Sequence, residues 1–152
     1  MIRIRPATAD DAAEIADQYA LLHADQWSAG GTPPRADHDP DWLAEVTTAL
    51  ASPGTSLFVA EADGVVVGTA RIEFAERPYF RIADVRRVYV RPAWRRRGVG
   101  VELMRAAEAA AMEGGAAEVR LSVVPENEPA LAFYRHLGYG DFAIRLSKRI
   151  RP

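Results

Sequence analysis

Apolar and polar residues alternate along several short stretches of the chain and follow helical spacing along others. Alternation or short apolar runs predict strands, and repeats of three and four residues predict helices. The strands are expected at residues 2–6, 56–62, 65–74, 81–90, 118–124 and 142–146. The helices are expected at residues 12–22, 42–50, 101–113 and 127–137. The predicted order is therefore β-α-α-β-β-β-α-β-α-β.

The connections between these elements favour a mixed sheet. Asp63-Gly64 separates two strand-like runs and is a strong hairpin signal. The strand–helix–strand order across residues 81–124 predicts a right-handed parallel crossover. No linker, repeat or low-complexity tract divides the chain, so one α/β domain spanning residues 1–152 is expected.

Composition narrows the class of protein without naming a function. The chain is 49% hydrophobic, carries a net charge of −2 and contains no cysteine, which excludes disulfides and a protein thiol nucleophile. No run reaches the roughly 20 apolar residues of a membrane span, and the first residues do not resemble a secretory signal. A cytoplasmic protein without membrane or nucleic-acid partners is expected.

The basic charge is concentrated at one place. Six arginines and no acid lie between residues 86 and 97, and the last three precede Gly98-Val99-Gly100 at a predicted helix start. A helix start presents unpaired N–H groups and partial positive charge, and glycine lets an anion approach the main chain. The stretch lacks the patterns of a Walker loop and of a dinucleotide fingerprint. It predicts a binding site for a small, strongly anionic ligand.

Two motifs then suggest a family. RRRGVG, with Arg95, Gly98 and Gly100, resembles the [QR]-x-x-G-x-[GA] signature of the GCN5-related N-acetyltransferase (GNAT) family. NEPALAFYRHLGY, residues 127–139, resembles the N-x-x-A-x-x-F-Y-x-x-x-G-[FY] segment of the same family. The element order is also similar, so the resemblance covers essentially the whole chain. It implies the GNAT-like acyl-CoA N-acyltransferase fold.

The resemblance implies acetyl-CoA as co-substrate and an amine as acceptor, with direct transfer and no acyl-enzyme. The coenzyme is expected where strands 81–90 and 118–124 splay apart. Main-chain groups at the end of the first strand would hold the pantetheine arm, and the arginine-rich turn would hold the pyrophosphate. Asn127, at the start of the helix over residues 127–137, would also contact the arm. The implied coenzyme contacts are Val88, Tyr89, Val90, Arg95, Arg96, Arg97, Gly98, Val99, Gly100, Val101, Asn127 and Tyr134.

The catalytic groups are less well defined. Tyr134 matches the family tyrosine that is proposed to protonate the departing thiolate, and it could equally be a packed core residue. Many family members carry a strand glutamate where this chain has Arg86. Asp84 and Glu73 are the candidate substitutes for that base, and a water chain or an acceptor arriving deprotonated remains open. Asn127 is also a preferred helix cap.

Several alternatives stay open at this stage. The missing strand glutamate keeps a non-catalytic acyl-CoA-binding regulator possible, and the basic turn could serve nucleic acid or be fortuitous. The acidic segment 36–42 lacks the register of a metal site, so no metal is expected, and it is interpreted as part of a loop that shapes the acceptor site. The acceptor itself is not predicted, and a homodimer is possible.

Overall fold

The computed structural model describes residues 1–28 and 40–151. Its strands are β1 (Ile2–Pro6), β2 (Thr55–Ala62), β3 (Val65–Glu76), β4 (Arg81–Val90) and β5 (Glu118–Arg120). Its α-helices are α1 (Ala12–Ser28), α2 (Trp42–Ala51), α3 (Val99–Glu113) and α4 (Glu128–His136). The acidic segment that sequence analysis assigned to the acceptor loop lies, up to residue 39, outside the described residues.

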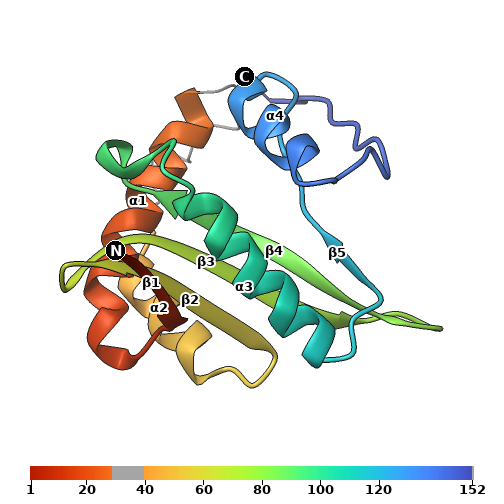
Figure 1. Ribbon diagram of the computed structural model, residues 1–152. Helices are drawn as coiled ribbons and strands as arrows, with labels where there is room; N and C mark the ends of the chain where they lie inside the picture. Colours follow the sequence, from red (N-terminus) through yellow and green to blue (C-terminus); the bar gives the residue numbers. More distant parts are fainter. Residues whose placement is uncertain (29–39, 152) are drawn as a thin grey trace.

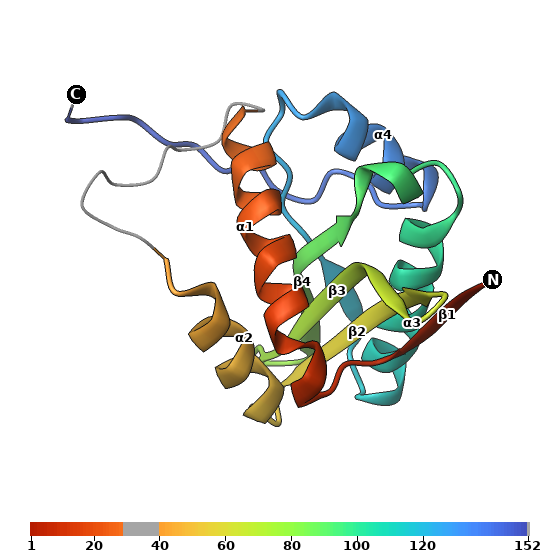
Figure 2. The same cartoon turned by 90° about the vertical axis from the view of Figure 1, so that its left-hand side faces the viewer.

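The strands form one sheet in the order β1-β2-β3-β4-β5. β1 to β4 are antiparallel neighbours, and β5 lies parallel to β4 after the crossover through α3. Figure 1 and Figure 2 show α1 and α2 on one face of the sheet and α3 on the other. The expected mixed α/β fold class, with its meander and parallel crossover, is confirmed.

Each face of the sheet has its own apolar core. On one face, α1 and α2 bring Ile15, Tyr19 and Val46 against β2 and β3, where they are buried. On the other face, Leu103 and Ala107 of α3 pack against apolar residues of β2, β3 and β4. Burial of one face of each helix explains why their apolar positions recur at helical spacing. The two cores hold the end of β4 and the start of α3 in fixed relative positions.

Two strand predictions are corrected. The strand expected over residues 118–124 ends at Arg120, because β5 pairs only with Ile82, Ala83 and Asp84 before the chain leaves β4. The last strand, expected over residues 142–146, is not formed within the described part of the chain. Alternation makes a strand only where a neighbouring edge completes its hydrogen bonds, and this segment has no such neighbour among the described strands. Its apolar side chains stay exposed: Phe142, Ile144 and Leu146.

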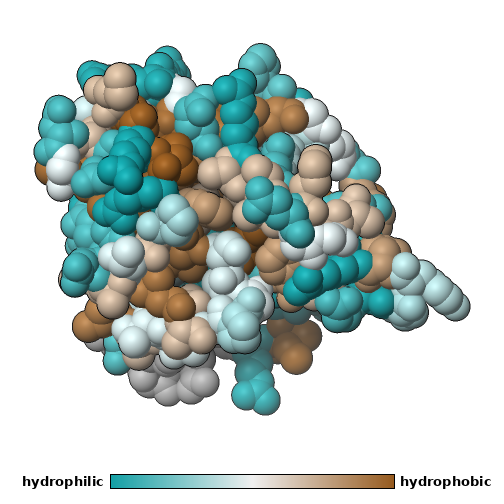
Figure 3. All heavy atoms as spheres, turned by 60° about the horizontal axis from the view of Figure 1, so that its bottom comes forward, coloured by the Kyte–Doolittle hydropathy of each residue, from teal (hydrophilic) through white to brown (hydrophobic). Residues whose placement is uncertain are grey.

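One face of the molecule is mixed in polarity. Figure 3 shows hydrophobic and hydrophilic side chains interspersed on the face at the bottom of Figure 1, with the β3–β4 hairpin projecting at the right.

Among the helices of the described residues, none has both the length and the apolar character required to cross a lipid bilayer.

A partly buried ion pair closes the connection from β1 to α1. Arg5 donates to both carboxylate oxygens of Asp11, at 2.8 and 2.9 Å, and the amide of Thr8 donates to the same carboxylate at 2.8 Å. Thr8 and Asp11 therefore form a capping box. The hydrogen bonds from Arg5 and Thr8 outweigh burial and lower the pKa of Asp11.

Replacing Asp11 with Asn should lower the free energy of unfolding at pH 7 by about 2 kcal/mol, or Tm by about 6 °C. Because the folded-state pKa of Asp11 lies below its unfolded value, the carboxylate stabilises the protein above the unfolded pKa. This contribution disappears as pH falls through the folded pKa. Calorimetric melting of Asp11→Asn and wild type should therefore converge as pH falls below the unfolded pKa of Asp11. Asp10→Asn, on the exposed side of the same turn, should melt like wild type; an equal loss in Asp10→Asn would contradict the assignment.

Candidate active site

The edge of β4 becomes unpaired where β5 ends. The last parallel pair is Asp84 with Arg120, and no described strand follows on that side. The amide of Arg91 donates to the carbonyl of Val67 on β3 at 2.8 Å. Since main-chain groups alternate sides along a strand, Val88 and Val90 direct theirs to the open edge, and Tyr89 directs its own toward β3. Of the three residues expected to contact the pantetheine arm, only Val88 and Val90 therefore direct their main-chain groups toward the open edge.

Arg95 lies across this open edge. Its Nε donates to the carbonyl of Val90 at 2.8 Å, and its guanidinium is 5.3 Å from the ring of Tyr89. One terminal nitrogen also lies 3.2 Å from Asp25 on α1. Arg95 therefore joins the end of β4 to α1, and the three neighbouring arginines are not equivalent.

The turn after β4 is shaped as an anion cradle. Arg96 and Gly98 have positive φ angles of 61° and 79°, in the left-handed region. α3 begins at Val99 with Gly98 as its N-cap, and no side chain caps its first amides. The first intrahelical hydrogen bond runs from Glu102 to Gly98, so the amides of residues 98–101 have no partner within the helix. Successive amides in such a turn converge on one point and favour an anion.

The other two arginines of the turn leave their charge available. Arg97 stacks on the ring of Trp94 at 5.1 Å, and Arg96 is exposed. Neither forms an ion pair with any described residue. A guanidinium without a carboxylate partner can bind phosphate with two parallel hydrogen bonds. The turn therefore fits a pyrophosphate by both its main chain and its side chains.

α4 lies next to this turn. Asn127 caps α4, accepting from the amide of Ala130 at 3.3 Å, so the capping role expected for it is confirmed. A Cβ at Gly100 would lie 3.1 Å from the ring of Phe133, which places α4 against the first turn of α3. Figure 1 shows α4 above the N-terminal end of α3. The two motifs found in the sequence are therefore neighbours in space.

Tyr134 belongs to an aromatic group on α4 and the turn after it. Its ring is 5.0 Å from that of Phe133 and 5.9 Å from that of Tyr139. Burial raises the pKa of the Tyr134 phenol to about 12. Tyr139, by contrast, donates its hydroxyl to Glu108 at 2.8 Å. Tyr134 is thus the one of these two phenols without a protein partner among the described residues.

The two candidate bases lie elsewhere in the sheet. Glu73 is the cross-strand neighbour of Asp84. Its carboxylate accepts hydrogen bonds from Arg71 on one oxygen and, at 3.0 Å, from Arg86 on the other. Although burial opposes it, these two arginines lower the pKa of Glu73. Asp84 is four residues before Val88, about 13 Å along the strand. Neither carboxylate is brought to the open end of β4.

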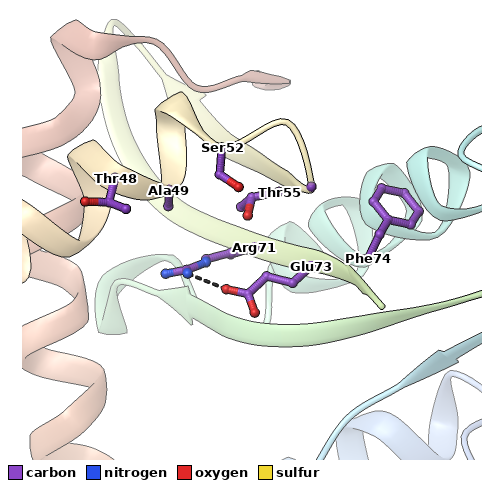
Figure 4. A pocket seen from close by; sticks show the side chains of 8 residues that line it. Thr48, Ala49, Ser52, Thr55, Arg71, Glu73 and Phe74 are labelled. Atoms are coloured by element: carbon purple, nitrogen blue, oxygen red, sulfur yellow. Dashed lines mark hydrogen bonds and ion pairs between the residues drawn. The ribbon is translucent and has the colours of Figure 1, made fainter. Parts of the chain in front are cut away.

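The structure also gathers a charged group that sequence analysis did not single out. It lies under α1 and α2 and contains Tyr19, Trp42, Glu45, Arg71 and Arg87. The available signal was in β3, where Arg71 and Glu73 alternate with apolar residues although helices cover that face. Figure 4 shows Arg71 and Glu73 side by side, beside a pocket of about 270 Å³ that hydroxyl groups from α2 and β2 also line.

We compared the chain with protein families and with curated sequences. A family model described as the acetyltransferase (GNAT) family matches residues 17–139. No curated protein sequence matches the chain.

Solved structures share the fold at low sequence identity. The aminoglycoside N-acetyltransferase AAC(6')-Iy in complex with CoA is 21% identical with a TM-score of 0.80, over 100% of this chain and 96% of that one. An aminoglycoside acetyltransferase from an uncultured soil metagenomic sample, in complex with sisomicin, is 19% identical with a TM-score of 0.75, over 99% and 97%. A transcriptional regulator from Bacillus halodurans is 22% identical with a TM-score of 0.79, over 99% and 100%.

The matched residues include the anion cradle, the open end of β4 and all of α4. The enzyme class expected from the sequence, an acyl-CoA-dependent N-acetyltransferase with acetyl-CoA as co-substrate, is that of the matching family. Both the family model and the fold therefore agree with the two motifs, and the chain belongs to the acetyltransferase (GNAT) family.

Proposed function

We propose that this protein, as one domain over residues 1–152, transfers an acetyl group from acetyl-CoA to a primary amine by direct attack in a ternary complex. The observation that carries the proposal is the uncapped start of α3 beside the unpaired edge of β4. The family match supports the enzyme class, and neighbours of the same fold were solved with CoA or with an acceptor.

This geometry supports the following coenzyme contacts. The amides of Gly98, Val99, Gly100 and Val101 would bind the pyrophosphate, with Arg96 and Arg97 adding charge. Main-chain groups of Val88 and Val90 would pair with the pantetheine arm, and Arg95 would then exchange its bond to Val90 for a contact with the coenzyme. Asn127 uses its side-chain oxygen in the cap, so its amide nitrogen is the group that would contact the arm.

The reaction needs few protein groups. The amine nitrogen attacks the thioester carbon, and the amide of Val88 would stabilise the negative charge that develops on the carbonyl oxygen. The bond from carbon to sulfur breaks, and Tyr134 would donate its proton to the leaving thiolate. The chain has no cysteine that could form an acyl-enzyme. Direct transfer therefore agrees with both composition and site.

The amine proton would leave through water. Glu73 is held ionised by two arginines, and Asp84 lies too far along β4 to touch an amine next to Val88. Asp84 would take part only through a chain of waters. Turnover at low amine concentration should accordingly rise with pH until the acceptor itself is deprotonated.

One observation favours a second candidate, a non-catalytic acyl-CoA-binding regulator. Arg86 occupies the position of the family's strand glutamate, and it forms an ion pair with Glu73 at 3.0 Å. Such a protein would bind acetyl-CoA without releasing thiol in the presence of any amine. Thiol release that depends on an added amine would remove this candidate.

Calorimetric titration with acetyl-CoA should show saturable binding of one molecule per chain. The double variant Arg96→Ala, Arg97→Ala should weaken binding about tenfold, because each guanidinium adds charge-assisted hydrogen bonds to phosphate. Raising the salt concentration should shrink this difference, since these side chains are exposed. CoA and 3′-dephospho-CoA, titrated in parallel, separate the pyrophosphate contribution from that of the 3′-phosphate. Arg3→Ala, exposed on β1, is the control, and folded protein that does not bind acetyl-CoA would refute the proposal.

A further inference from the structure

Two arginines face each other on the side of the sheet that α1 and α2 cover. Arg71 on β3 and Arg87 on β4 are cross-strand neighbours, and we call them the arginine pair. Oε1 of Glu45 on α2 lies between them, 3.7 Å from Arg71 and 3.0 Å from Arg87. One carboxylate therefore serves two guanidinium groups.

Aromatic rings enclose the arginine pair on one side. The guanidinium of Arg87 is 5.5 Å from the ring of Tyr19 and 5.7 Å from that of Trp42. These two rings meet edge to face at 6.4 Å. The side chain of Arg71 is 12% exposed, and Tyr19 is 1% exposed. Arg71 and Tyr19 are thus largely removed from water, and charge interactions are strong in such surroundings. The side chains of Arg87 and Glu45 are 28% and 34% exposed.

Several buried polar atoms of this cluster have no hydrogen-bond partner among the described residues, and most of them are donors. Three buried donors have no partner among the described residues: the Nε groups of the arginine pair and the hydroxyl of Tyr19. A single buried acceptor of the cluster, Oε2 of Glu45, also has no partner among the described residues. Buried polar groups are nearly always hydrogen-bonded, so a purely structural ion-pair network would be expected to satisfy itself. The cluster therefore has more unpaired donors than unpaired acceptors.

Charge counts point the same way. The guanidinium groups of Arg71, Arg86 and Arg87 interact with the carboxylates of Glu45 and Glu73, which leaves one positive charge in excess. An added carboxylate would neutralise it and supply two acceptor oxygens. A guanidinium binds a carboxylate with better geometry than it binds any other common organic anion except phosphate.

We propose that the arginine pair, with Tyr19, binds a carboxylate of the acceptor, so that the acceptor is a small amino carboxylic acid. This inference rests on the proposed function and names its substrate class. It distinguishes the chain from neighbours whose structures contain aminoglycosides, because a polycationic acceptor would gain nothing from a cluster with excess positive charge.

The position of the cluster limits the acceptor further. Arg87 directly precedes Val88, whose amide is the proposed oxyanion donor. The Cα atoms of Arg87 and Val88 are about 3.8 Å apart, so we infer that the carboxylate bound at Arg87 and the amine next to Val88 belong to one small molecule, as in an amino carboxylic acid. The pocket next to Arg71 and Glu73 is lined by the hydroxyl-bearing residues Thr48, Ser52 and Thr55.

The first test compares matched amines with wild-type protein. Free amino acids, the corresponding amino acid amides and the aminoglycoside sisomicin are assayed with acetyl-CoA by thiol release. Each is also titrated calorimetrically into the complex with CoA, which reports binding without turnover. At least one amino acid should bind at least tenfold more tightly than its amide. Equal binding of acid and amide, or preference for sisomicin, would overturn the inference and leave the proposed function standing.

The second test uses variants. Arg87→Gln should raise KM for the preferred amino acid about 10- to 30-fold, leave its kcat nearly unchanged and remove the preference over the amide. Arg87→Lys keeps the charge and should recover part of the preference. Arg3→Gln, on the exposed side of β1 and outside this cluster, should keep it.

Two outcomes separate the inference from the function on which it rests. A loss of acetyl-CoA binding by wild type would remove the proposed function and the inference together. A general rise of KM for acid and amide alike in Arg87→Gln, with unaltered Kd for acetyl-CoA and unaltered Tm, would assign Arg87 a packing role and overturn only the inference.

Discussion

Tyr134→Phe should lower kcat about 100-fold while changing the Kd of acetyl-CoA by less than twofold. The substitution removes one hydroxyl and keeps the ring that packs between Phe133 and Tyr139. General acids typically increase the rate about 100- to 10,000-fold. A phenol whose pKa is raised to about 12 is a weak acid, so the expected loss of kcat is at the lower end of that range. Thiol release under saturating acetyl-CoA measures kcat, and calorimetry measures Kd.

The pH dependence separates Tyr134 from the acceptor amine. With a pKa of about 12, the phenol stays protonated between about pH 6 and pH 10, so it adds no inflection there. Wild type and Tyr134→Phe should therefore show parallel pH profiles at different heights. Tyr139→Phe is the matched control, because its hydroxyl is engaged by Glu108; it should keep kcat. Equal kcat in Tyr134→Phe and wild type would exclude Tyr134 as the acid.

Gly98→Val should weaken acetyl-CoA binding about 100-fold. Gly98 has a φ of 79°, and a β-branched residue adopts this conformation only at a cost of about 1–3 kcal/mol. The turn would relax toward negative φ, and the amides that converge on the pyrophosphate would lose their alignment. Losing about two charge-assisted hydrogen bonds, near 3 kcal/mol together, corresponds to the expected factor. Calorimetric titration measures it directly.

A second glycine provides a control with the same strain. Gly64 lies in the β2–β3 hairpin and has the same φ of 79°. At both glycines an added Cβ would meet no heavy atom within 4 Å, so the backbone conformation alone opposes the substitution. Gly64→Val should therefore lose comparable stability and keep acetyl-CoA affinity. If both variants lost affinity equally, the effect of Gly98→Val would be a consequence of destabilisation, and the cradle would not be the binding site.

Features that depend on neighbouring residues were accessible from the sequence. The turn at residues 95–100 needs two glycines and a following helix, and these lie within a few residues of one another. Strand alternation, the Asp63-Gly64 hairpin and the cap by Asn127 are local in the same sense. Since each is decided by backbone preferences and short-range hydrogen bonds, the order of elements and the anion cradle were predictable.

Features that depend on distant partners were decided only by the tertiary structure. The segment 142–146 alternates as a strand would, yet it forms none because it pairs with no edge of the described strands. The open edge of β4 exists because β5 ends after three paired residues. The charged cluster joins Tyr19, Glu45, Arg71 and Arg87 from four different elements.

The sequence by itself therefore determined the fold class, the family motifs and the turn that would bind the pyrophosphate, because local chemistry specifies them. Only the tertiary structure decided which main-chain groups of β4 face the opening. It also paired Glu73 with two arginines, which makes this carboxylate a poor base. It also decided which charges share a buried site. Strand pairing and burial join residues far apart in the chain, and a single sequence does not display those contacts.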